Sequence, residues 1–275
     1  MTTSAGQQRY WLGDSPPEVD HLLAQAEFLA PDAAALLACT GVAPGASVID
    51  IGCGVLGILP ELRSRAGHGG RVVGLDIEPR LLAVAGQLSA QRGLAVETVS
   101  ADAASTGLPS GSFDLVHERM LLLNVTSPQD IVTEMTRLTR PGGIVALQEP
   151  DSAAWAIDPP HPAWEMLLTE VTDLYPRTGR DFHTGRRAAR LLRDAGLRDV
   201  QVQVIARLTA PGDYFQTFLL TLSALMREEI LAGGRVTPSE LDSAAVALRE
   251  HLSQPSTLTC LPTIWQAWGR QPDTR

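Results

Sequence analysis

A glycine-rich turn after an apolar run constrains this chain more than any other feature. Residues 48–57 read Val-Ile-Asp-Ile-Gly-Cys-Gly-Val-Leu-Gly. A strand that bends directly into a helix needs backbone conformations open mainly to glycine, and a missing Cβ lets a ligand lie against the main chain. The turn therefore predicts the binding site of a nucleotide-like cofactor. The carboxylate of Asp50, two residues before the first glycine, would repel the phosphates of a dinucleotide and therefore favours a cationic cofactor.

Three further apolar runs follow at residues 71–75, 113–117 and 143–148. Each is separated from its neighbour by a stretch long enough for a helix, and this alternation predicts a parallel β-α-β sheet. Residues 79–92 and 127–139 have helical spacing and are expected to cover the sheet.

Four motifs in register resemble the class I S-adenosylmethionine-dependent methyltransferases, of the bacterial small-molecule and ubiquinone-biosynthesis-like type. They are Asp50-Ile51-Gly52-Cys53-Gly54, Gly74-Leu75-Asp76, Ala101-Asp102-Ala103 and Arg140-Pro141-Gly142-Gly143, and the resemblance spans residues 40–150. It implies an α/β fold with a Rossmann-like seven-stranded sheet, helices on both faces and a helical cap. It also implies S-adenosyl-L-methionine as the cofactor, with S-adenosyl-L-homocysteine as product. The family's third loop glycine is displaced here, because Leu56 stands in its place and Gly57 follows.

The resemblance assigns roles to residues around this cofactor. Gly52 and Gly54 would bring main-chain atoms to the methionine part, and Asp50 would support the loop or meet the ammonium. Asp76 ends a strand where it can accept both ribose hydroxyls. Asp102 would accept the adenine amine, with a helix cap as its alternative role. The full predicted cofactor set is Asp50, Gly52, Gly54, Asp76, Ile77, Asp102, Ala103, Arg119 and Gln25.

Methyl transfer asks the protein mainly to align a nucleophile and to manage one proton. Glu149 and Asp151 follow a predicted strand and are the first candidates for that proton, with His117 or Glu118 at another strand end. Ligands of open α/β sheets bind at the carboxyl ends of strands, which favours these residues. Capping or an arginine partner is the alternative role for each.

Residues 151–190 are rich in aromatic side chains and are expected to build a substrate pocket. Trp155, Trp164 and Tyr175 could stack on a flat substrate, or could simply pack in a core. His161 and His183 are further base candidates in this stretch. Tyr10 and Trp11 precede a helix start at Ser15-Pro16-Pro17-Glu18 and are candidates for an active-site lid.

The remaining elements complete a single domain with four parts. Residues 200–206 and 258–268 are predicted as strands that pair antiparallel at the sheet edge, and 213–232 and 238–252 as helices inserted between them. The predicted parts are an N-terminal lid (1–40), a cofactor-binding core (41–150), a substrate-pocket insertion (151–190) and the end of the sheet with its helical pair (191–275). Such a helical pair forms a lid or a contact in a homodimer.

Composition excludes several functions. All 22 basic residues are arginine, which excludes a P-loop lysine, a pyridoxal phosphate Schiff base and the Tyr-x-x-x-Lys pair of short-chain dehydrogenases. A net charge of -9 disfavours nucleic acid. Cys39, Cys53 and Cys260 lack metal-ligand spacing. With no recognisable signal peptide or bilayer-crossing stretch, we expect a cytoplasmic protein without a membrane partner.

These features predict methyl transfer to a small, apolar or aromatic metabolite, at oxygen, nitrogen, sulfur or carbon, including a ring carbon such as that of an indole. Two alternatives stay open. The literal G-x-G-x-x-G spacing of Gly52, Gly54 and Gly57 is compatible with an NAD(P)-dependent oxidoreductase. A non-catalytic S-adenosylmethionine-binding protein would bind the same cofactor in a closed pocket.

Overall fold

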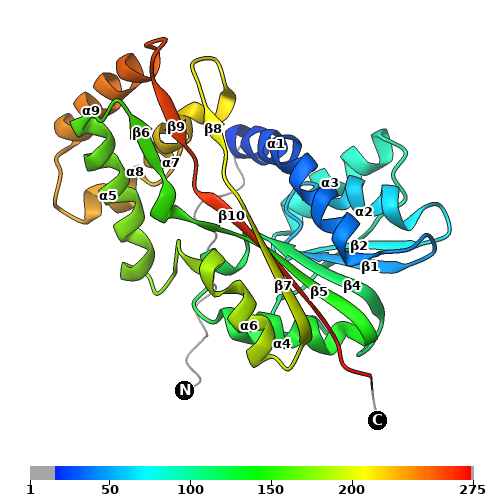
Figure 1. Cartoon of the computed structure of the whole chain (residues 1–275). Helices are drawn as coiled ribbons and strands as arrows, with labels where there is room; N and C mark the ends of the chain where they lie inside the picture. The colour runs from blue at the N-terminus through cyan, green and yellow to red at the C-terminus, as the bar shows by residue number, and fades with distance from the viewer. Residues whose placement is uncertain (1–15, 274–275) are drawn as a thin grey trace, which may run out of the picture.

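A seven-stranded sheet organises the chain, and the computed structural model describes residues 16–273 of it (Figure 1). Its strands are β1 (Ser47–Ile51), β2 (Arg71–Asp76), β3 (Glu97–Ser100), β4 (Phe113–Arg119), β5 (Thr139–Asp151), β7 (Arg198–Ile205) and β10 (Thr263–Arg270). They lie in the order β3-β2-β1-β4-β5-β10-β7. The first five are parallel, and β10 runs antiparallel to both β5 and β7. The predicted α/β fold and its antiparallel edge are confirmed.

The helices are α1 (Pro16–Thr40), α2 (Leu59–Ala66), α3 (Pro79–Gln91), α4 (Pro128–Leu138), α5 (Pro162–Arg177), α6 (Ala188–Asp194), α7 (Phe218–Leu225), α8 (Arg227–Ala232) and α9 (Pro238–Leu252). Short 3-10 turns are η1 (Leu122–Asn124), η2 (Ser152–Ala154), η3 (Thr184–Arg187) and η4 (Tyr214–Thr217). The helix predicted over 213–232 is therefore three shorter pieces. Strand β3 was not predicted, because its four residues are mostly exposed and carry no apolar run.

Alternate residues of each central strand pack on opposite layers of helices. Val48 of β1 lies in a core cluster with α1 and α2, whereas Ile49 lies in a cluster with α4 and α6. The same alternation holds for Val72 and Val73 of β2. Because both faces are covered, these strands read as continuous apolar runs rather than alternating ones.

The three strands at the β7 side of the sheet, β5, β10 and β7, bend and lead into a second sheet. Strands β6 (Ala156–Asp158), β9 (Leu258–Cys260) and β8 (Leu208–Thr209) pair in the order β6-β9-β8, which repeats the order β5-β10-β7. Between β9 and β10 stands Pro262, which has no N–H to donate to a ladder. The single strand predicted over 258–268 is therefore two strands with a bend between them. Figure 1 shows the edge strands running from the main sheet into the helical cap.

The cap is formed by α5, α7, α8 and α9, whose buried side chains make one cluster. It combines the predicted insertion at 151–190 with the later helices. At its centre the Trp155 and Trp164 rings meet edge to face at a centroid distance of 5.9 Å.

Helix α1 lies between the cap and the α2–α3 side of the molecule (Figure 1). Its segment Val19–Thr40 is, among the described residues, the one helix long and apolar enough to cross a membrane by length and composition alone. This corrects the expectation that the chain contains no such stretch. Ala33, Leu36 and Leu37 of this helix have no exposed surface, because they pack into the core with α2.

The packing of Trp164 generates a stability prediction. Its side chain is 1% exposed, so Trp164→Ala should leave a cavity and lower the free energy of unfolding by about 3 to 5 kcal/mol. Val246→Ala, at a cap residue that is 59% exposed, is the control and should change stability by less than about 0.5 kcal/mol. Urea unfolding measures both, and a Trp164 variant as stable as the control would contradict the packing role.

Candidate functional site

A cleft opens at the carboxyl ends of β1, β2 and β4. Its volume is about 1680 Å³ including the solvent-open mouth. Every predicted cofactor residue lines it, namely Asp50, Gly52, Gly54, Asp76, Ile77, Asp102, Ala103, Arg119 and Gln25. The structure therefore brings together residues from five separate segments of the chain.

The glycine loop of this cleft needs its displaced glycine. Gly57 has φ +51°, and a Cβ there would lie 2.3 Å from Oδ2 of Asp50. Asp50 itself is buried: its Oδ2 accepts a hydrogen bond from the Ile58 amide at 3.3 Å, and its Oδ1 lies 2.8 Å from Nδ1 of His117. Leu56, the departure from the family pattern, is 2% exposed and packs with Val55 and Leu81 in a separate apolar cluster. It does not line the cleft, so the displaced glycine leaves room for a ligand.

Asp76 links the end of β2 to the loop. Its Oδ2 accepts from the Gly54 amide at 2.8 Å, and its Oδ1 accepts from the Glu78 amide at 2.9 Å. Burial raises the pKa of this carboxyl, although the amide hydrogen bonds oppose that shift. A carboxylate oxygen has more than one acceptor site. Asp76 can therefore hold the loop and still accept from a diol.

One end of the cleft suits a flat heterocycle. Ile77 lines this end and is 52% exposed, so it offers an apolar surface to a ligand. Asp102 caps the following turn, because its Oδ1 accepts from the Ala104 amide at 2.8 Å. No helix begins at this turn in the described residues, so the bond is not the helix cap of the alternative, and Asp102 and Ala103 line the cleft.

The other end carries an unpaired donor. Arg119 donates from Nη2 to the Gly57 carbonyl at 3.0 Å, but its Nη1 is buried and has no hydrogen-bond partner among the described residues. Burial lowers the pKa of this guanidinium. A buried N–H without a partner costs stability that a ligand carboxylate would restore. S-adenosylmethionine presents a carboxylate, a diol and an adenine, so the cleft fits the cofactor.

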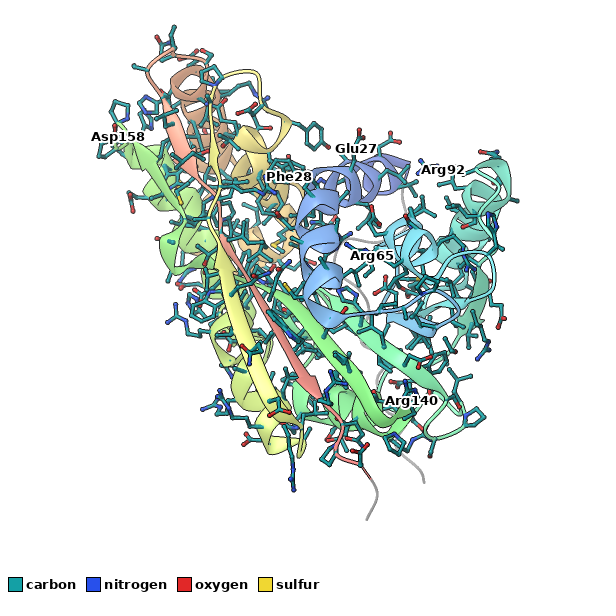
Figure 2. The ribbon with its side chains drawn as sticks, turned by 45° about the vertical axis from the view of Figure 1, so that its right-hand side comes forward. Glu27, Phe28, Arg65, Arg92, Arg140 and Asp158 are labelled. Carbon is teal, nitrogen blue, oxygen red and sulfur yellow. The ribbon has the colours of Figure 1, made fainter. Side chains whose placement is uncertain are left out.

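A second cavity of about 880 Å³ adjoins the cleft. Its wall is largely apolar and comes from α1, from residues 120–124, from the bend between the two sheets and from the cap. Five aromatic rings lie among its mostly aliphatic lining, those of Phe28, Tyr175, Phe182, Phe215 and Phe218. Figure 2 shows Phe28 on the side of α1 that faces the cap, with Glu27 on the outer side. Gln25, Met120 and Asn124 line both cavities and mark their junction.

Two buried glutamates hold the junction segment, residues 120–124, in place. Glu149 accepts from the amides of Leu122 and Leu123 at 2.8 and 3.0 Å, and Glu118 accepts from the amide of Leu121 at 3.2 Å. Met120 has φ +55°, a conformation that costs a side chain about 1 to 3 kcal/mol and needs support from its surroundings. The carboxyl groups supply part of that support.

The same two carboxyl groups also influence each other's ionisation, and Oε1 of Glu118 is buried with no hydrogen-bond partner among the described residues. Burial, and then the charge of Glu149, raises the pKa of Glu118 well above its usual range. Burial raises the pKa of Glu149 to about 7. Neither side chain lines a cavity, and neither has an exposed surface. This corrects the prediction that Glu149 handles the substrate proton, since its oxygens are used by the backbone.

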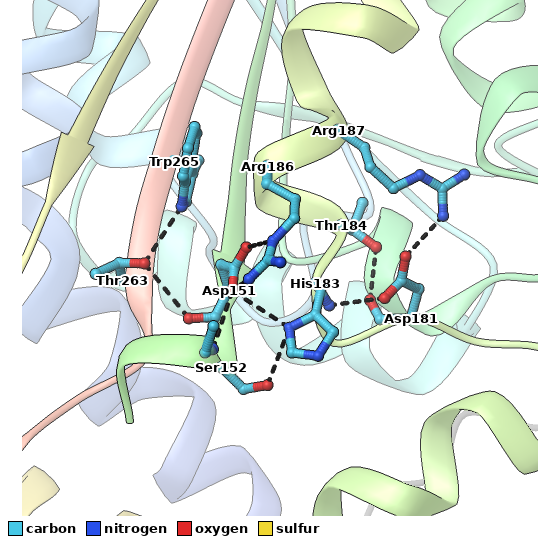
Figure 3. Close-up of polar contacts among 10 residues, drawn as sticks. Asp151, Ser152, Asp181, His183, Thr184, Arg186, Arg187, Thr263 and Trp265 are labelled. Carbon is cyan, nitrogen blue, oxygen red and sulfur yellow. Dashed lines mark hydrogen bonds and ion pairs between the residues drawn. The ribbon is translucent and has the colours of Figure 1, made fainter. Parts of the chain in front are cut away.

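The other two predicted catalytic residues also lie away from both cavities. His117 is fully buried, and its Nδ1 and Nε2 are occupied by Asp50 and by Gln148, the latter at 2.9 Å. Asp151 is clamped by Arg186 and also lies 3.2 Å from Nδ1 of His183 (Figure 3). The predictions of a catalytic His117 and Asp151 are therefore corrected: one supports the glycine loop and the other anchors η3.

The Asp151 network is not a hydrolytic relay either. Burial opposes ionisation of Asp151, but the hydrogen bonds from Arg186 and the Ala153 amide leave its pKa below the usual value. Ser152 Oγ lies 3.3 Å from the same Nδ1 of His183 that Asp151 contacts. A serine relay uses opposite nitrogens of the ring for the acid and the nucleophile.

The predicted substrate residues divide in two. Tyr175 lines the second cavity. Trp155 and Trp164 do not, and their buried contact supports the core-packing alternative. His161 caps α5 by accepting from the Ala163 amide at 3.2 Å, which corrects its assignment to the pocket. Tyr10 and Trp11 lie outside the described residues.

Several cavity residues were missed by the sequence reasoning. Among them are His21, Phe28, Phe215 and Phe218. A signal existed for the first two, because His21, Gln25 and Phe28 have the i, i+4, i+7 spacing of one helix face. Gln25 had been singled out, but its neighbours on that face had not.

Comparisons with known proteins agree with this geometry. Residues 49–147 match the family model described as a methyltransferase domain. Nocamycin O-methyltransferase of Saccharothrix syringae is 36% identical over 139 residues, 48% of this chain and 49% of that protein. Ubiquinone biosynthesis O-methyltransferase of Burkholderia pseudomallei is 35% identical over 169 residues, 59% of this chain and 69% of that protein. The match thus spans about half of the first relative and two thirds of the second.

Solved structures show the same fold at low identity. A putative methyltransferase from Bacillus halodurans superposes with a TM-score of 0.62 at 16% identity, covering 88% of this chain and 99% of that one. Phosphoethanolamine N-methyltransferase 2 of Haemonchus contortus, solved with phosphomonomethylethanolamine and S-adenosylhomocysteine, gives 0.61 at 16% identity and covers 98% and 60%.

The buried glutamate pair generates a prediction about pH. Glu149 has a pKa of about 7 in the folded protein against an ordinary 4.5, so between these values the folded state keeps a proton that the unfolded state releases. The free energy of unfolding should therefore fall as pH rises through this window. Glu149→Gln should flatten the dependence, because an amide at this buried position has no proton to titrate. Urea unfolding from pH 4.5 to 8 measures the slope.

Glu165→Gln, at an exposed residue of α5, is the matched control and should keep the wild-type slope. A Glu149→Gln slope equal to that of the control would show that burial does not raise the pKa of Glu149.

Proposed function

Because the chain belongs to the class I S-adenosylmethionine-dependent methyltransferases, we propose that it transfers a methyl group to a small, apolar or aromatic molecule held in the second cavity. The observation that carries this proposal is the contact between the two cavities. Gln25, Met120 and Asn124 border both, so a donor in the cleft and an acceptor beyond it would meet at this junction.

The proposed orientation of the donor follows from the cleft. Arg119 would receive the carboxylate of the methionine part next to the glycine loop, where its Nη1 is unpaired. Asp76 would accept the ribose hydroxyls, and Asp102 with Ala103 would meet the adenine, whose ring face would rest on Ile77. When bound, S-adenosylmethionine supplies a methyl group on a good leaving group. The remaining task of the protein is to align the acceptor and exclude water.

The second cavity supports an acceptor with an apolar body. Its volume falls within the range of small-molecule sites, and its aromatic walls favour a flat or hydrophobic ligand. Both relatives are named as O-methyltransferases, which supports oxygen as the methylated atom. Helix α1 contributes to both cavities, and we propose that it acts as a lid over the acceptor, with the cap as the facing wall.

The two alternatives make different demands on this site. A nicotinamide-dependent oxidoreductase would place a pyrophosphate at the glycine turn, where Asp50 is buried and ends β1. A protein that only binds S-adenosylmethionine has no use for the adjoining aromatic cavity. The paired cavities therefore favour an enzyme with two substrates.

Calorimetry and turnover test the proposal together. Titration with S-adenosylhomocysteine should show saturable binding, while NADH and NADPH should show none. Incubation with methyl-labelled S-adenosylmethionine and a panel of naphthols, indoles and aromatic amines should then label at least one acceptor. Binding of NADH in place of S-adenosylhomocysteine, or donor binding with no labelled product, would contradict the proposed function.

Arg119 provides a sharper prediction about the donor. Arg119→Met removes a charged hydrogen bond, so the Kd for S-adenosylhomocysteine should rise about 10- to 100-fold, that is about 1.5 to 3 kcal/mol. The Kd for 5′-methylthioadenosine, which has no amino-acid part, should change little. Isothermal titration of both nucleosides gives the comparison, and equal losses for the two would place Arg119 away from the carboxylate.

Asp76→Asn is the complementary variant. Its amide still reaches the loop but cannot accept two ribose hydroxyls as a carboxylate can, so both nucleosides should bind more weakly by a similar factor of about 5 to 100. A loss limited to S-adenosylhomocysteine would remove Asp76 from the ribose.

A further inference from the structure

We propose that His21 is the proton acceptor for a hydroxyl group of the methyl acceptor, so that this enzyme makes a methyl ether on an apolar or aromatic body. The inference rests on the proposed function and names the group that reacts.

His21 is an unsatisfied polar side chain in an apolar cavity. It is 4% exposed, it lines the second cavity, and neither Nδ1 nor Nε2 has a hydrogen-bond partner among the described residues. A buried polar group without a partner costs about 1 to 3 kcal/mol. A hydroxyl group in the cavity would supply that partner.

The position of His21 on α1 brings it near the junction. It precedes Gln25 by four residues, which places the two side chains one turn apart on the same helix face. Gln25 lines both cavities, whereas His21 lines only the second. His21 is therefore on the acceptor side, one helical turn from where donor and acceptor would meet.

Aromatic packing fixes the imidazole plane. The ring stacks on Phe218 of the cap at a centroid distance of 5.9 Å and an interplanar angle of 8°, and Phe215 lies at 6.1 Å. Stacking uses the face of the ring and leaves its nitrogens at the edge. The contact thus orients the imidazole and consumes neither nitrogen.

The charge state suits a base. Burial lowers the pKa of His21, so the ring is neutral and able to accept a proton at neutral pH. The other titratable groups that line the cavity are Arg207 and Tyr175. Arg207 forms an ion pair with Asp32, and burial raises the pKa of Tyr175, which keeps its hydroxyl protonated. Since Glu149, Asp151 and His117 lie outside both cavities, His21 is the acceptor-side base.

The proposed step balances as follows. The oxygen–hydrogen bond of the acceptor breaks and its proton goes to His21, while the oxygen forms a bond to the methyl carbon and the sulfur–methyl bond breaks. The products are the methyl ether, S-adenosylhomocysteine and an imidazolium, which returns its proton to water after release.

His21→Phe separates the base from the packing role, because phenylalanine keeps a stacked ring but has no nitrogen. With labelled S-adenosylmethionine, kcat for 2-naphthol should fall at least about 100-fold. The rate for 1-nitro-2-naphthol, whose hydroxyl ionises without help in mildly alkaline buffer, should fall by less than about 5-fold. The Kd for S-adenosylhomocysteine should stay at the wild-type value. His68→Phe, at an exposed histidine, is the control and should change neither rate.

Two results would overturn the proposal. One is equal loss, or no loss, for the two naphthols in His21→Phe, which indicates packing alone. The other is methyl transfer limited to indoles or amines, with no turnover of either naphthol. In that case an absorbance titration with 1-nitro-2-naphthol would also show no binding to the S-adenosylhomocysteine complex.

The pH profile gives an independent readout. In the wild-type enzyme kcat for 2-naphthol should decline as pH falls through the pKa of His21, because a protonated imidazole accepts nothing. That limb should disappear in His21→Phe. Failure of the proposed function looks different, since it would abolish donor binding or all labelling in the wild-type enzyme itself.

Discussion

The two buried carboxyl groups of Glu118 and Glu149 hold the segment that the rest of the site depends on. They accept hydrogen bonds from three consecutive backbone amides, those of residues 121–123. Without them, the turn that follows the left-handed Met120 would lose the acceptors of its three amides. Because Met120 and Asn124 border both cavities, this clamp determines where the cleft ends and where the acceptor cavity begins.

The second cavity follows from a break in three strands. If β5, β10 and β7 continued straight, the sheet would end at solvent, and nothing would lie opposite α1. Instead each strand breaks and leads into the second sheet: β5 through η2 into β6, β7 past Arg207 into β8, and β9 past Pro262 into β10. The bend itself lines the cavity through Ile205, Leu261 and Ile264. Arg207, at this bend, forms an ion pair with Asp32 of α1. This contact holds α1 against the second cavity.

Sequence patterns predicted the features that depend on neighbouring residues. The glycine turn, the apolar runs of β1, β2, β4 and β5 and the helix at 238–252 follow from local spacing, and the structure confirms them. The polar strand β3 and the break at Pro262 were missed, because short edge strands and bends are decided by tertiary pairing rather than by periodicity. The cofactor residues cluster as predicted, since they end parallel strands and so meet at one edge of the sheet.

The acceptor side could not be predicted in the same way, and the reason is physical. Four acidic residues lie at or near the carboxyl ends of strands, namely Asp50, Asp76, Glu149 and Asp151. Their spacing in the sequence alone makes them equally good candidates for a role in the site. What separates them is which backbone amides and arginines reach their oxygens, and this depends on contacts between distant segments, such as that of Arg186 with Asp151. Arg119 lines the cleft and His21 lines the cavity beyond it, and both have buried nitrogen atoms without a hydrogen-bond partner among the described residues. A ligand in these spaces would supply those partners.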